Sequence, residues 1–362
     1  MKILYIAPEI TNSGGIARVL ALKANYLTSV YNYQVTILCT KSDEETFFYD
    51  FDERIQIKTI FHSKYTFSFL NKYIVSLKKT IEKEQPDIII ICDAVLGVFL
   101  PFFLNIKTPV IFETHVTKFL KKDYKNSIMN KFKFKFIHFF KSKMLKTFDK
   151  IVFETVDGKK EWNIQNSVVI PNPISFTEQK TSKLNMKKAI NISRHSHEKG
   201  IDRLLYIWKK VIQSNPDWKL DIFGHWDSNL KYQKLAIDLG ISNYVNFYPP
   251  TKEVQDCYID SSIYLMTSRS EAFGMVLIEA MYSALPCIAY DCPVGPRNII
   301  TNNINGLLVE DGNESDFINK TNLLIANENL RNQLGLAAQE DSKKYNIDSV
   351  MSIWQNLFKE LT

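Results

Sequence analysis

The chain has 362 residues, of which 45% are hydrophobic and 13% aromatic, and a net charge of +6. This length and composition exclude a disordered chain and predict two globular domains, each with its own core. The five cysteines are odd in number and form no Cys-x-x-Cys pair, which argues against a disulfide framework or a zinc site and indicates a reducing compartment.

No apolar stretch approaches the roughly 18–20 residues of a membrane-spanning helix. The apolar run within 1–9 is too short for a signal peptide and predicts a buried strand instead. We therefore expect a cytoplasmic protein, either free or attached peripherally to the inner face of the plasma membrane.

Short β-branched runs alternate with helical patterns along most of the chain. The strands expected in the first half are 3–7, 34–39, 55–60, 87–92, 110–113 and 151–153. Those expected in the second half are 189–192, 219–223, 245–247, 263–267 and 287–290. Such alternation is typical of parallel sheets with helices on both faces.

The two halves of this pattern meet in a stiff segment, because Pro171 and Pro173 flank Asn172 and a polar stretch follows over 175–188. We therefore expect three parts, namely a domain over 1–172, a domain over 173–346 and a C-terminal helix over 347–362. The apolar stripe of that helix is predicted to hold Val350, Ile353, Trp354 and Phe358.

Two glutamates separated by seven residues lie in a strand–turn–helix pattern. Glu271 follows the apolar run 263–266, Gly274 lies in the turn, and Glu279 lies in a helix-like run that ends before Pro286. The first N–H groups of a helix have no partner within it, and the helix dipole favours an anion there. Two carboxylates beside such a phosphate site can accept hydrogen bonds from sugar hydroxyls, so the pattern predicts a nucleotide-sugar site.

Two other turns follow expected strands. Gly14 and Gly15 either let a phosphate or sugar approach the backbone or serve a steric purpose only. Arg194 and Lys199 either hold a diphosphate and stabilise it as it leaves, or are surface cations. No Gly-x-Gly-x-x-Gly fingerprint occurs, which disfavours a nicotinamide-dependent dehydrogenase.

His115 follows the expected strand 110–113, at the edge of a doubly wound sheet where ligands bind. The histidine could donate to a substrate hydroxyl there, or it could be structural. Asp50-Phe51-Asp52 has the form of a metal-binding Asp-x-Asp motif, but its surroundings predict a surface turn.

The segment Lys118–Lys150 is rich in lysine and interleaved with phenylalanine. A basic, aromatic segment can lie on an anionic membrane surface, at about 1 kcal/mol per lysine. It can equally be a solvated face with ordinary core phenylalanines, and nucleic acid is the least favoured partner because no binding motif accompanies it.

Together these residues resemble glycosyltransferase family 4, the retaining enzymes with the GT-B fold. The resemblance covers nearly the whole chain. It rests on the Gly14-Gly15 turn, the segment Val169-Ile-Pro-Asn-Pro173, Arg194 and Lys199, the Glu-x7-Glu pair, Asp291-Cys-Pro-Val-Gly-Pro296 and Asn305-Gly-Leu-Leu-Val309. It implies two doubly wound, Rossmann-like domains that face a central cleft, the first binding acceptor and the second nucleotide-sugar, with the C-terminal helix crossing back to the first.

The resemblance also implies residue roles. Arg194 and Lys199 would neutralise the leaving diphosphate, Glu271 would contact the donor sugar, and His115 would position donor and acceptor. The residues implied to bind the donor are Gly14, Gly15, Phe273, Gly274, Met275, Val276 and Glu279, the last through the ribose hydroxyls. No metal or other cofactor is implied.

The implied activity is retaining transfer of a hexose, UDP-linked by expectation, to a glycan or lipid-linked saccharide in capsule or O-antigen synthesis. The alternatives are a sugar-nucleotide epimerase on the same fold and a catalytically silent binding or assembly protein. Trp226 stands where the family often has glycine, and Asn298 where a glutamate is common. These departures bear on the identity of the donor.

Overall fold

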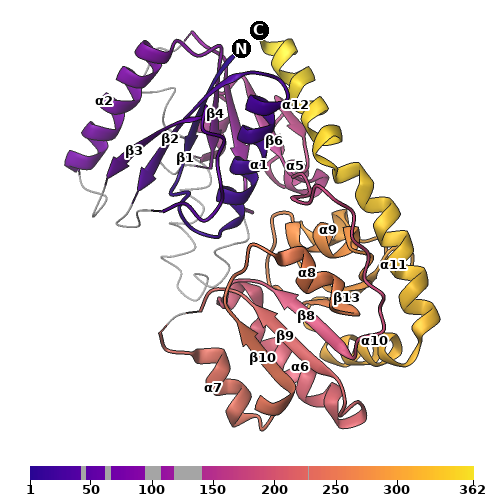
Figure 1. Ribbon diagram of the computed structural model, residues 1–362. Coiled ribbons are helices and arrows are strands. Elements are labelled where there is room, and N and C mark those ends of the chain that lie inside the picture. Colours follow the sequence, from indigo (N-terminus) through magenta and orange to yellow (C-terminus); the bar gives the residue numbers. More distant parts are fainter. Residues whose placement is uncertain (42–45, 62–66, 94–106, 118–140, 227) are drawn as a thin grey trace. The chain divides into compact units, whose positions relative to one another are not determined.

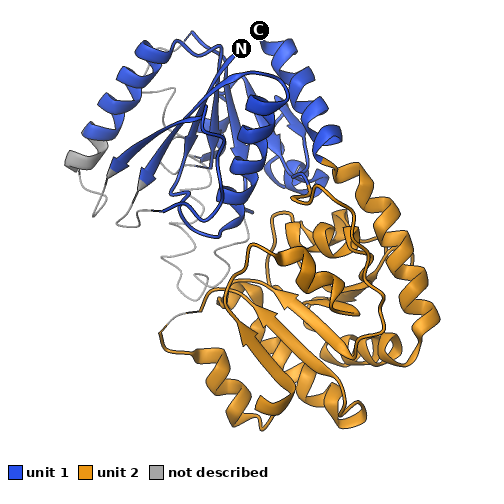
Figure 2. Cartoon of the chain, in the orientation of Figure 1, with its two compact units in different colours: residues 1–173, 347–362 blue, residues 174–346 orange. Residues whose placement is uncertain are grey.

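The computed structural model describes residues 1–41, 46–61, 67–93, 107–117, 141–226 and 228–362 (Figure 1). The chain divides into two compact units, which are coloured separately in Figure 2. Unit 1 holds Met1–Pro173 and Ile347–Thr362, and unit 2 holds Ile174–Asn346. The break after Pro173 lies in the proline-flanked segment, one residue from the boundary expected from the sequence.

Unit 1 contains a parallel sheet of seven strands in the order β3-β2-β1-β4-β5-β6-β7. The strands are β1 (Lys2–Ala7), β2 (Gln34–Lys41), β3 (Gln56–Phe61), β4 (Ile88–Cys92), β5 (Val110–Thr114), β6 (Lys150–Phe153) and β7 (Ser167–Val169). Every residue of β4 and β5 is buried, because helices cover both faces of the sheet.

Alternate residues of these strands pack against different helices. Ile3, Tyr5 and Ile90 contact the core formed with α1 (Gly15–Ser29) and α12 (Ile347–Leu361). Leu4 and Ile89 belong to the core on the other face, with α2 (Phe67–Glu84) and α5 (Val156–Trp162). The sheet is therefore doubly wound, as expected.

The C-terminal helix α12 packs on unit 1, beside α1 (Figure 1). Its buried face holds Val350, Met351, Trp354, Leu357 and Phe358. The prediction was wrong for Ile353, which is 40% exposed, because the buried residues Met351 and Phe358 shift the centre of the buried face toward the other side of Trp354. The Asp348 carboxylate accepts a hydrogen bond from the Tyr26 hydroxyl at 2.5 Å.

Unit 2 contains a parallel sheet of six strands in the order β10-β9-β8-β11-β12-β13. The strands are β8 (Lys188–Ile192), β9 (Lys219–Phe223), β10 (Val245–Tyr248), β11 (Ile263–Met266), β12 (Cys287–Asp291) and β13 (Leu307–Glu310). The helices are α6 (Ile201–Ser214), α7 (Lys231–Asp238), α8 (Val254–Ile259), α9 (Met275–Tyr282), α10 (Glu314–Ala326) and α11 (Glu328–Ser342).

The helices of unit 2 also cover both faces of their sheet, with α6, α7 and α10 on one core and α8 and α9 on the other. The strands β7 and β13 were not expected. Both are short strands at the edge of a sheet, and each pairs with a single neighbouring strand, β7 with β6 and β13 with β12.

Candidate functional site

The ends of β8 and β11 form the topological switch point of unit 2. These strands pair with each other, while β9 and β10 extend the sheet on one side and β12 and β13 on the other. Ligands of open α/β sheets bind outside the carboxyl ends of the strands at such a point. Lys199 and Glu271 belong to the loops that leave these two strands.

Close contacts join the two loops. The Arg269 N–H donates to the Glu198 carbonyl at 2.7 Å, and the Thr267 hydroxyl donates to the Gly200 carbonyl at 2.9 Å. Gly200 has a φ of +66°, and a Cβ there would lie 2.1 Å from the Thr267 carbonyl oxygen. Glycine is therefore needed where one loop crosses the other.

Lys199 and Glu271 form an ion pair at this crossing. Nζ of Lys199 lies 2.8 Å from both carboxylate oxygens of Glu271, and the Ser268 hydroxyl donates to Oε1 at 2.7 Å. The side chains are 20% and 8% exposed, so the pair is largely shielded from water. The structure thus brings together one residue expected to bind phosphate and one expected to contact the sugar.

Arg194 lies on the same loop but extends into solvent. Its side chain is 63% exposed, and Nη2 lies 3.4 Å from Oε1 of Glu198. Lys199 is the last residue of the 3-10 helix His197–Lys199, whereas Arg194 precedes this helix. A ligand could therefore approach the arginine without breaking a buried contact.

Glu279 lies on α9 and is fully buried. The Ser175 hydroxyl donates to Oε1 and the Tyr258 hydroxyl to Oε2, each at 3.2 Å. A buried carboxylate needs such donors, since an unpaired buried charge costs several kcal/mol. Tyr258 and Ser175 were not identified from the sequence, and nothing in their local patterns marks them.

The helix α9 begins directly after Gly274, whose φ of +104° favours glycine. The four residues expected to present their backbone, Phe273 to Val276, therefore span the turn and the first residues of the helix. Gly295 packs against this turn, because a Cβ there would lie 2.6 Å from the Phe273 carbonyl oxygen and 2.7 Å from Cβ of Glu271. From the sequence alone, Gly295 could be identified only because the segment Asp291–Pro296 resembles the family pattern.

Aromatic side chains lie near the carboxyl ends of β9 and β10. The Trp226 ring lies 5.5 Å from that of His195, and Phe223 stacks on Tyr248 with ring centroids 4.6 Å apart. Trp226 thus lies next to the loop that carries Arg194 and Lys199. Asn298 ends the 3-10 helix Pro296–Asn298, and its side-chain amide donates to the Val294 carbonyl.

In unit 1 the expected glycine turn caps α1. Gly14 is the N-cap residue, and its N–H donates to the Asn12 side-chain oxygen at 2.8 Å. A Cβ at Gly14 would lie 2.6 Å from that oxygen, whereas a Cβ at Gly15 would have no atom within 4 Å. A Cβ at Gly14 would therefore meet only the end of the Asn12 side chain, and Gly15 borders open space.

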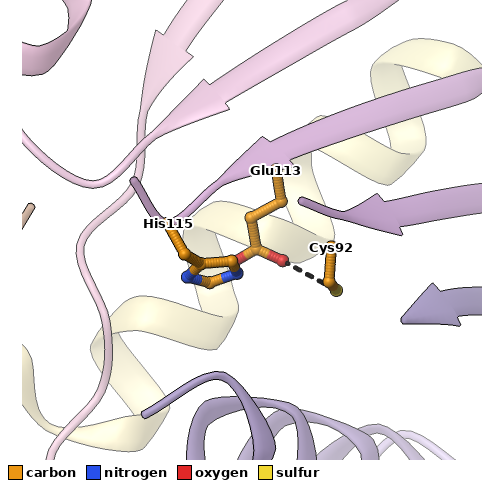
Figure 3. Close-up of side chains that lie close together, drawn as sticks. All are labelled: Cys92, Glu113 and His115. Atoms are coloured by element: carbon orange, nitrogen blue, oxygen red, sulfur yellow. Dashed lines mark hydrogen bonds and ion pairs between the residues drawn. The ribbon is translucent and has the colours of Figure 1, made fainter. Parts of the chain in front are cut away.

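His115, directly after β5, lies in a buried cluster of charged side chains, of which Figure 3 draws His115 and Glu113 beside Cys92. Its Nδ1 lies 2.7 Å from Oε1 of Glu154, and its Nε2 lies 3.6 Å from Oε1 of Glu113. Lys23 on α1 pairs with Glu113, and the Asn172 amide donates to Glu154 at 2.6 Å. The imidazole is 5% exposed, so its contacts are with protein groups.

The charges of this cluster shift the pKa values of its members. Burial acts to raise the pKa of Glu113, but Lys23 and His115 outweigh it and hold that pKa below its usual range. Burial likewise acts to lower the pKa of His115, but Glu113 and Glu154 raise it well above its usual value. The cluster thus stabilises an imidazolium between two carboxylates.

Two predictions concern surface segments. The Asp52 carboxylate accepts hydrogen bonds from the Arg54 N–H at 3.0 Å and from its side chain, which confirms turn chemistry for the Asp-x-Asp segment. Residues 118–140 of the basic stretch lie outside the described residues. No helix among the described residues is long and apolar enough to cross a membrane.

Comparisons with family models match both units. A model described as "Glycosyl transferases group 1" matches residues 175–341, and one described as "Glycosyl transferase 4-like" matches residues 11–155. The first match covers the loops after β8 and β11 and the helix α9. The second covers the glycine turn and His115.

Curated relatives resemble the chain over most of its length. An uncharacterized glycosyltransferase of Haemophilus influenzae is 28% identical over 98% of this chain and 99% of its own. The amylovoran biosynthesis glycosyltransferase AmsD of Erwinia amylovora is 27% identical over the same shares. The lipopolysaccharide 1,6-galactosyltransferase of Escherichia coli is 26% identical over 91% of this chain and 90% of its own.

Solved structures share the fold. Sucrose-phosphate synthase from Thermosynechococcus elongatus superimposes with a TM-score of 0.84 at 15% identity, covering 100% of this chain and 99% of that one. HepE from Anabaena, in complex with UDP and glucose, gives 0.76 at 16% identity and 99% coverage of both chains. The two Rossmann-like units thus match the GT-B architecture.

Proposed function

We propose that this chain, which its family matches and fold indicate to be a GT-B glycosyltransferase, is a retaining enzyme of family 4. It would transfer a hexose from a UDP-linked donor to a glycan or lipid-linked saccharide acceptor. The observation that carries this proposal is the Lys199–Glu271 ion pair at the switch point of unit 2, in the turn that leads into α9. Unit 2 would bind the donor and unit 1 the acceptor.

Negative charge develops on the departing nucleoside diphosphate as the sugar–phosphate bond breaks, and the enzyme has to stabilise this charge. Lys199 and Arg194 supply two cations on one loop, and the N-terminus of α9 supplies backbone N–H groups and a helix dipole. In this proposal these groups stabilise the leaving group and no metal ion is needed.

Lys199 would change partners when the donor binds. A diphosphate near Nζ competes with Glu271 for the lysine, and the carboxylate then becomes available to hydroxyl groups of the sugar. Ser268, which donates to Glu271 at 2.7 Å, would keep the carboxylate in place during this exchange. The ion pair is thus a preorganised form of the site, and Glu279 would receive the ribose hydroxyls.

We propose retention of the anomeric configuration because neither glutamate of the donor site is available as a nucleophile. Glu271 is occupied with Lys199 and the sugar, and Glu279 with Ser175 and Tyr258. We therefore propose attack from the face that the diphosphate leaves, with a phosphate oxygen accepting the proton of the acceptor hydroxyl. His115 would have a positioning role at the end of β5, because Glu113 and Glu154 hold its ring.

The acceptor is proposed to belong to surface polysaccharide synthesis. This rests on the relatives whose names contain lipopolysaccharide or amylovoran biosynthesis. A lipid-linked acceptor would suit a protein that binds anionic membrane through Lys118–Lys150. Sedimentation of the intact protein with anionic liposomes at low salt tests that binding, and a protein that stays in the supernatant contradicts it.

The activity itself is tested with a panel of UDP-hexoses and saccharide acceptors, followed by NMR of the new anomeric centre. Retained configuration in a glycoside product supports the proposal, and inverted configuration contradicts the retaining mechanism. An isomerised sugar nucleotide formed without acceptor would identify an epimerase. Tight UDP binding without turnover on any acceptor would identify a silent binding protein.

A further inference from the structure

Three side chains that metal ions prefer lie together at the carboxyl ends of β4 and β5 (Figure 3). Cys92 is the last residue of β4 and pairs in register with Glu113 of β5. His115 lies two residues further along the same chain segment, on the same side as Glu113. The backbone of two neighbouring parallel strands therefore brings a thiol, a carboxylate and an imidazole to one point.

Two distances in this Cys92–Glu113–His115 cluster, one to each oxygen of the Glu113 carboxylate, are close to those between ligands of a zinc ion. One ligand atom from each residue lies within 4.8 Å of the others. Sγ of Cys92 is 3.5 Å from Oε2 of Glu113, and Nε2 of His115 is 3.6 Å from Oε1 of the same carboxylate. Zinc bonds of about 2.0–2.3 Å in tetrahedral geometry separate neighbouring ligand atoms by about 3.3–3.6 Å.

The histidine is held as a metal-binding histidine usually is. Its Nδ1 pairs with Glu154 at 2.7 Å, and Glu154 also accepts from the Asn172 amide at 2.6 Å. This leaves Nε2 directed at the cluster, where the atom is buried and makes no hydrogen bond to the described residues. A carboxylate on the far nitrogen is the common second partner of zinc-bound histidine, because it fixes the ring and raises its basicity.

The surrounding charges can accommodate a divalent ion. Lys23 contacts Oε1 of Glu113, which leaves Oε2 on the side of Cys92. Nζ of the lysine also lies 4.5 Å from the centre of the Trp354 ring. The charges of Lys23 and a zinc ion would be matched by the Cys92 thiolate and the carboxylates of Glu113 and Glu154. No net charge would then be buried, which is the condition for a stable site in this interior.

We propose that Cys92, Glu113 and His115 bind a zinc ion that fixes the end of β5 in unit 1. Binding replaces two protons, that of the Cys92 thiol and that on Nε2 of the His115 imidazolium, and a water molecule completes the coordination. The ion would hold the ring of His115, the residue to which the proposed function gives a positioning role, whereas the proposed donor site lies in unit 2. The proposal goes beyond the transferase activity, and metal binding can be measured without it.

The three ligands escape a search of the sequence for metal motifs. Cys92 and Glu113 are 21 residues apart and come from different strands, whereas zinc motifs are recognised by short spacings. The absence of a Cys-x-x-Cys pair therefore argues only against a zinc site built from a short sequence motif, and not against one at the ends of β4 and β5.

The test is metal binding by the full chain. Protein freed of metal with a chelator is dialysed against zinc sulfate and then against buffer, and bound zinc is counted by mass spectrometry. We expect about one zinc per chain and a higher melting temperature. Cobalt(II) should give an intense thiolate-to-metal absorption with tetrahedral ligand-field bands. Wild-type protein that retains no zinc and gives no such absorption overturns the proposal.

Variants locate the site. Cys92→Ala should abolish the thiolate absorption, and Glu154→Gln should weaken zinc binding about 10–100-fold. Cys39→Ala removes another buried thiol from the same core and Cys257→Ala a thiol of unit 2, so both should bind zinc as wild type does. Zinc bound equally by wild type and Cys92→Ala would be adventitious and would contradict the assignment. Should Cys92→Ala fail to fold, the cobalt spectrum of the wild type still decides.

Discussion

Nζ of Lys199 lies 2.8 Å from both carboxylate oxygens of Glu271, and the two residues come from loops that leave adjacent strands of one sheet. The contact depends on Gly200, which lets the first loop pass under the carbonyl of Thr267. The ammonium group of Lys199 and the carboxylate of Glu271 are thereby held together where water has little access. A ligand that carries both phosphate and hydroxyl groups can engage the two of them at once.

Removal of the lysine should reduce turnover strongly. We expect Lys199→Ala to lower kcat/KM about 10²–10³-fold, since losing one preorganised group that stabilises developing charge costs about 3–4 kcal/mol. Lys187→Ala is the control, because Lys187 is an exposed lysine paired with Asp217 at the surface. Steady-state kinetics measure both variants. Turnover of Lys199→Ala close to wild type would remove the lysine from the mechanism.

Glu279 should determine nucleotide affinity. The substitution Glu279→Gln keeps the shape but removes the charge, so we expect the Kd for UDP to rise about 10–100-fold, as for hydrogen bonds to a charged group worth about 1.5–3 kcal/mol. Tyr258→Phe removes one neutral donor to the same carboxylate and should have a smaller effect. Isothermal titration calorimetry measures the Kd. Equal affinities in Glu279→Gln and wild type would rule out the ribose contact.

Two glycines with similar backbone angles separate backbone strain from steric overlap. Gly200 and Gly240 have φ values of +66° and +73°, but only Gly200 has a neighbouring carbonyl where a Cβ would lie. We expect Gly240→Ala to cost about 1 kcal/mol and Gly200→Ala about 2–4 kcal/mol in the free energy of unfolding. Urea denaturation gives both values. Equal losses of unfolding free energy in the two variants would show that the Thr267 carbonyl can move away from an added Cβ at little cost.

The attachment of α12 can be tested at adjacent positions. Trp354 is 1% exposed and Ile353 is 40% exposed. Trp354→Ala should destabilise the protein by about 3–5 kcal/mol through the cavity it leaves. Ile353→Ala should change stability by less than about 0.5 kcal/mol, as surface substitutions usually do. A thermal unfolding series in which both variants behave alike would show that α12 does not pack on unit 1 as described.

Cys257 provides a prediction for pH. Burial, followed by Asp256, raises the pKa of the Cys257 thiol to about 11. Only a small fraction is thiolate at pH 8, so alkylation by iodoacetamide should be at least about tenfold slower than for an ordinary thiol of pKa about 8.5. The rate should rise about tenfold per pH unit up to pH 10, because the thiolate is the reacting form. Peptide mass spectrometry follows the labelling, and a rate that levels off near pH 9 would contradict the raised pKa.

Much of the architecture could be predicted because it depends on local patterns. Apolar runs such as that of β4 and the alternation of strands with helices indicate doubly wound sheets, and the prolines on either side of Asn172 mark the break between units. The short strands β7 and β13 were missed, although the other two edge strands, β3 and β10, were expected. Ile353 was misplaced because several helical faces fit so short a pattern.

The sequence predicted the proposed donor site as residue types at spacings, namely Arg194 and Lys199 after one strand and Glu271 and Glu279 around a turn. Their contacts arise from strand order, because β8 and β11 are adjacent in space although separated by 70 residues of chain between Ile192 and Ile263. Only the folded chain pairs Lys199 with Glu271, buries Glu279 beneath Ser175 and Tyr258, and brings Cys92 to Glu113 and His115. Periodicity is a property of neighbours along the chain, whereas these contacts depend on which parallel strands lie side by side.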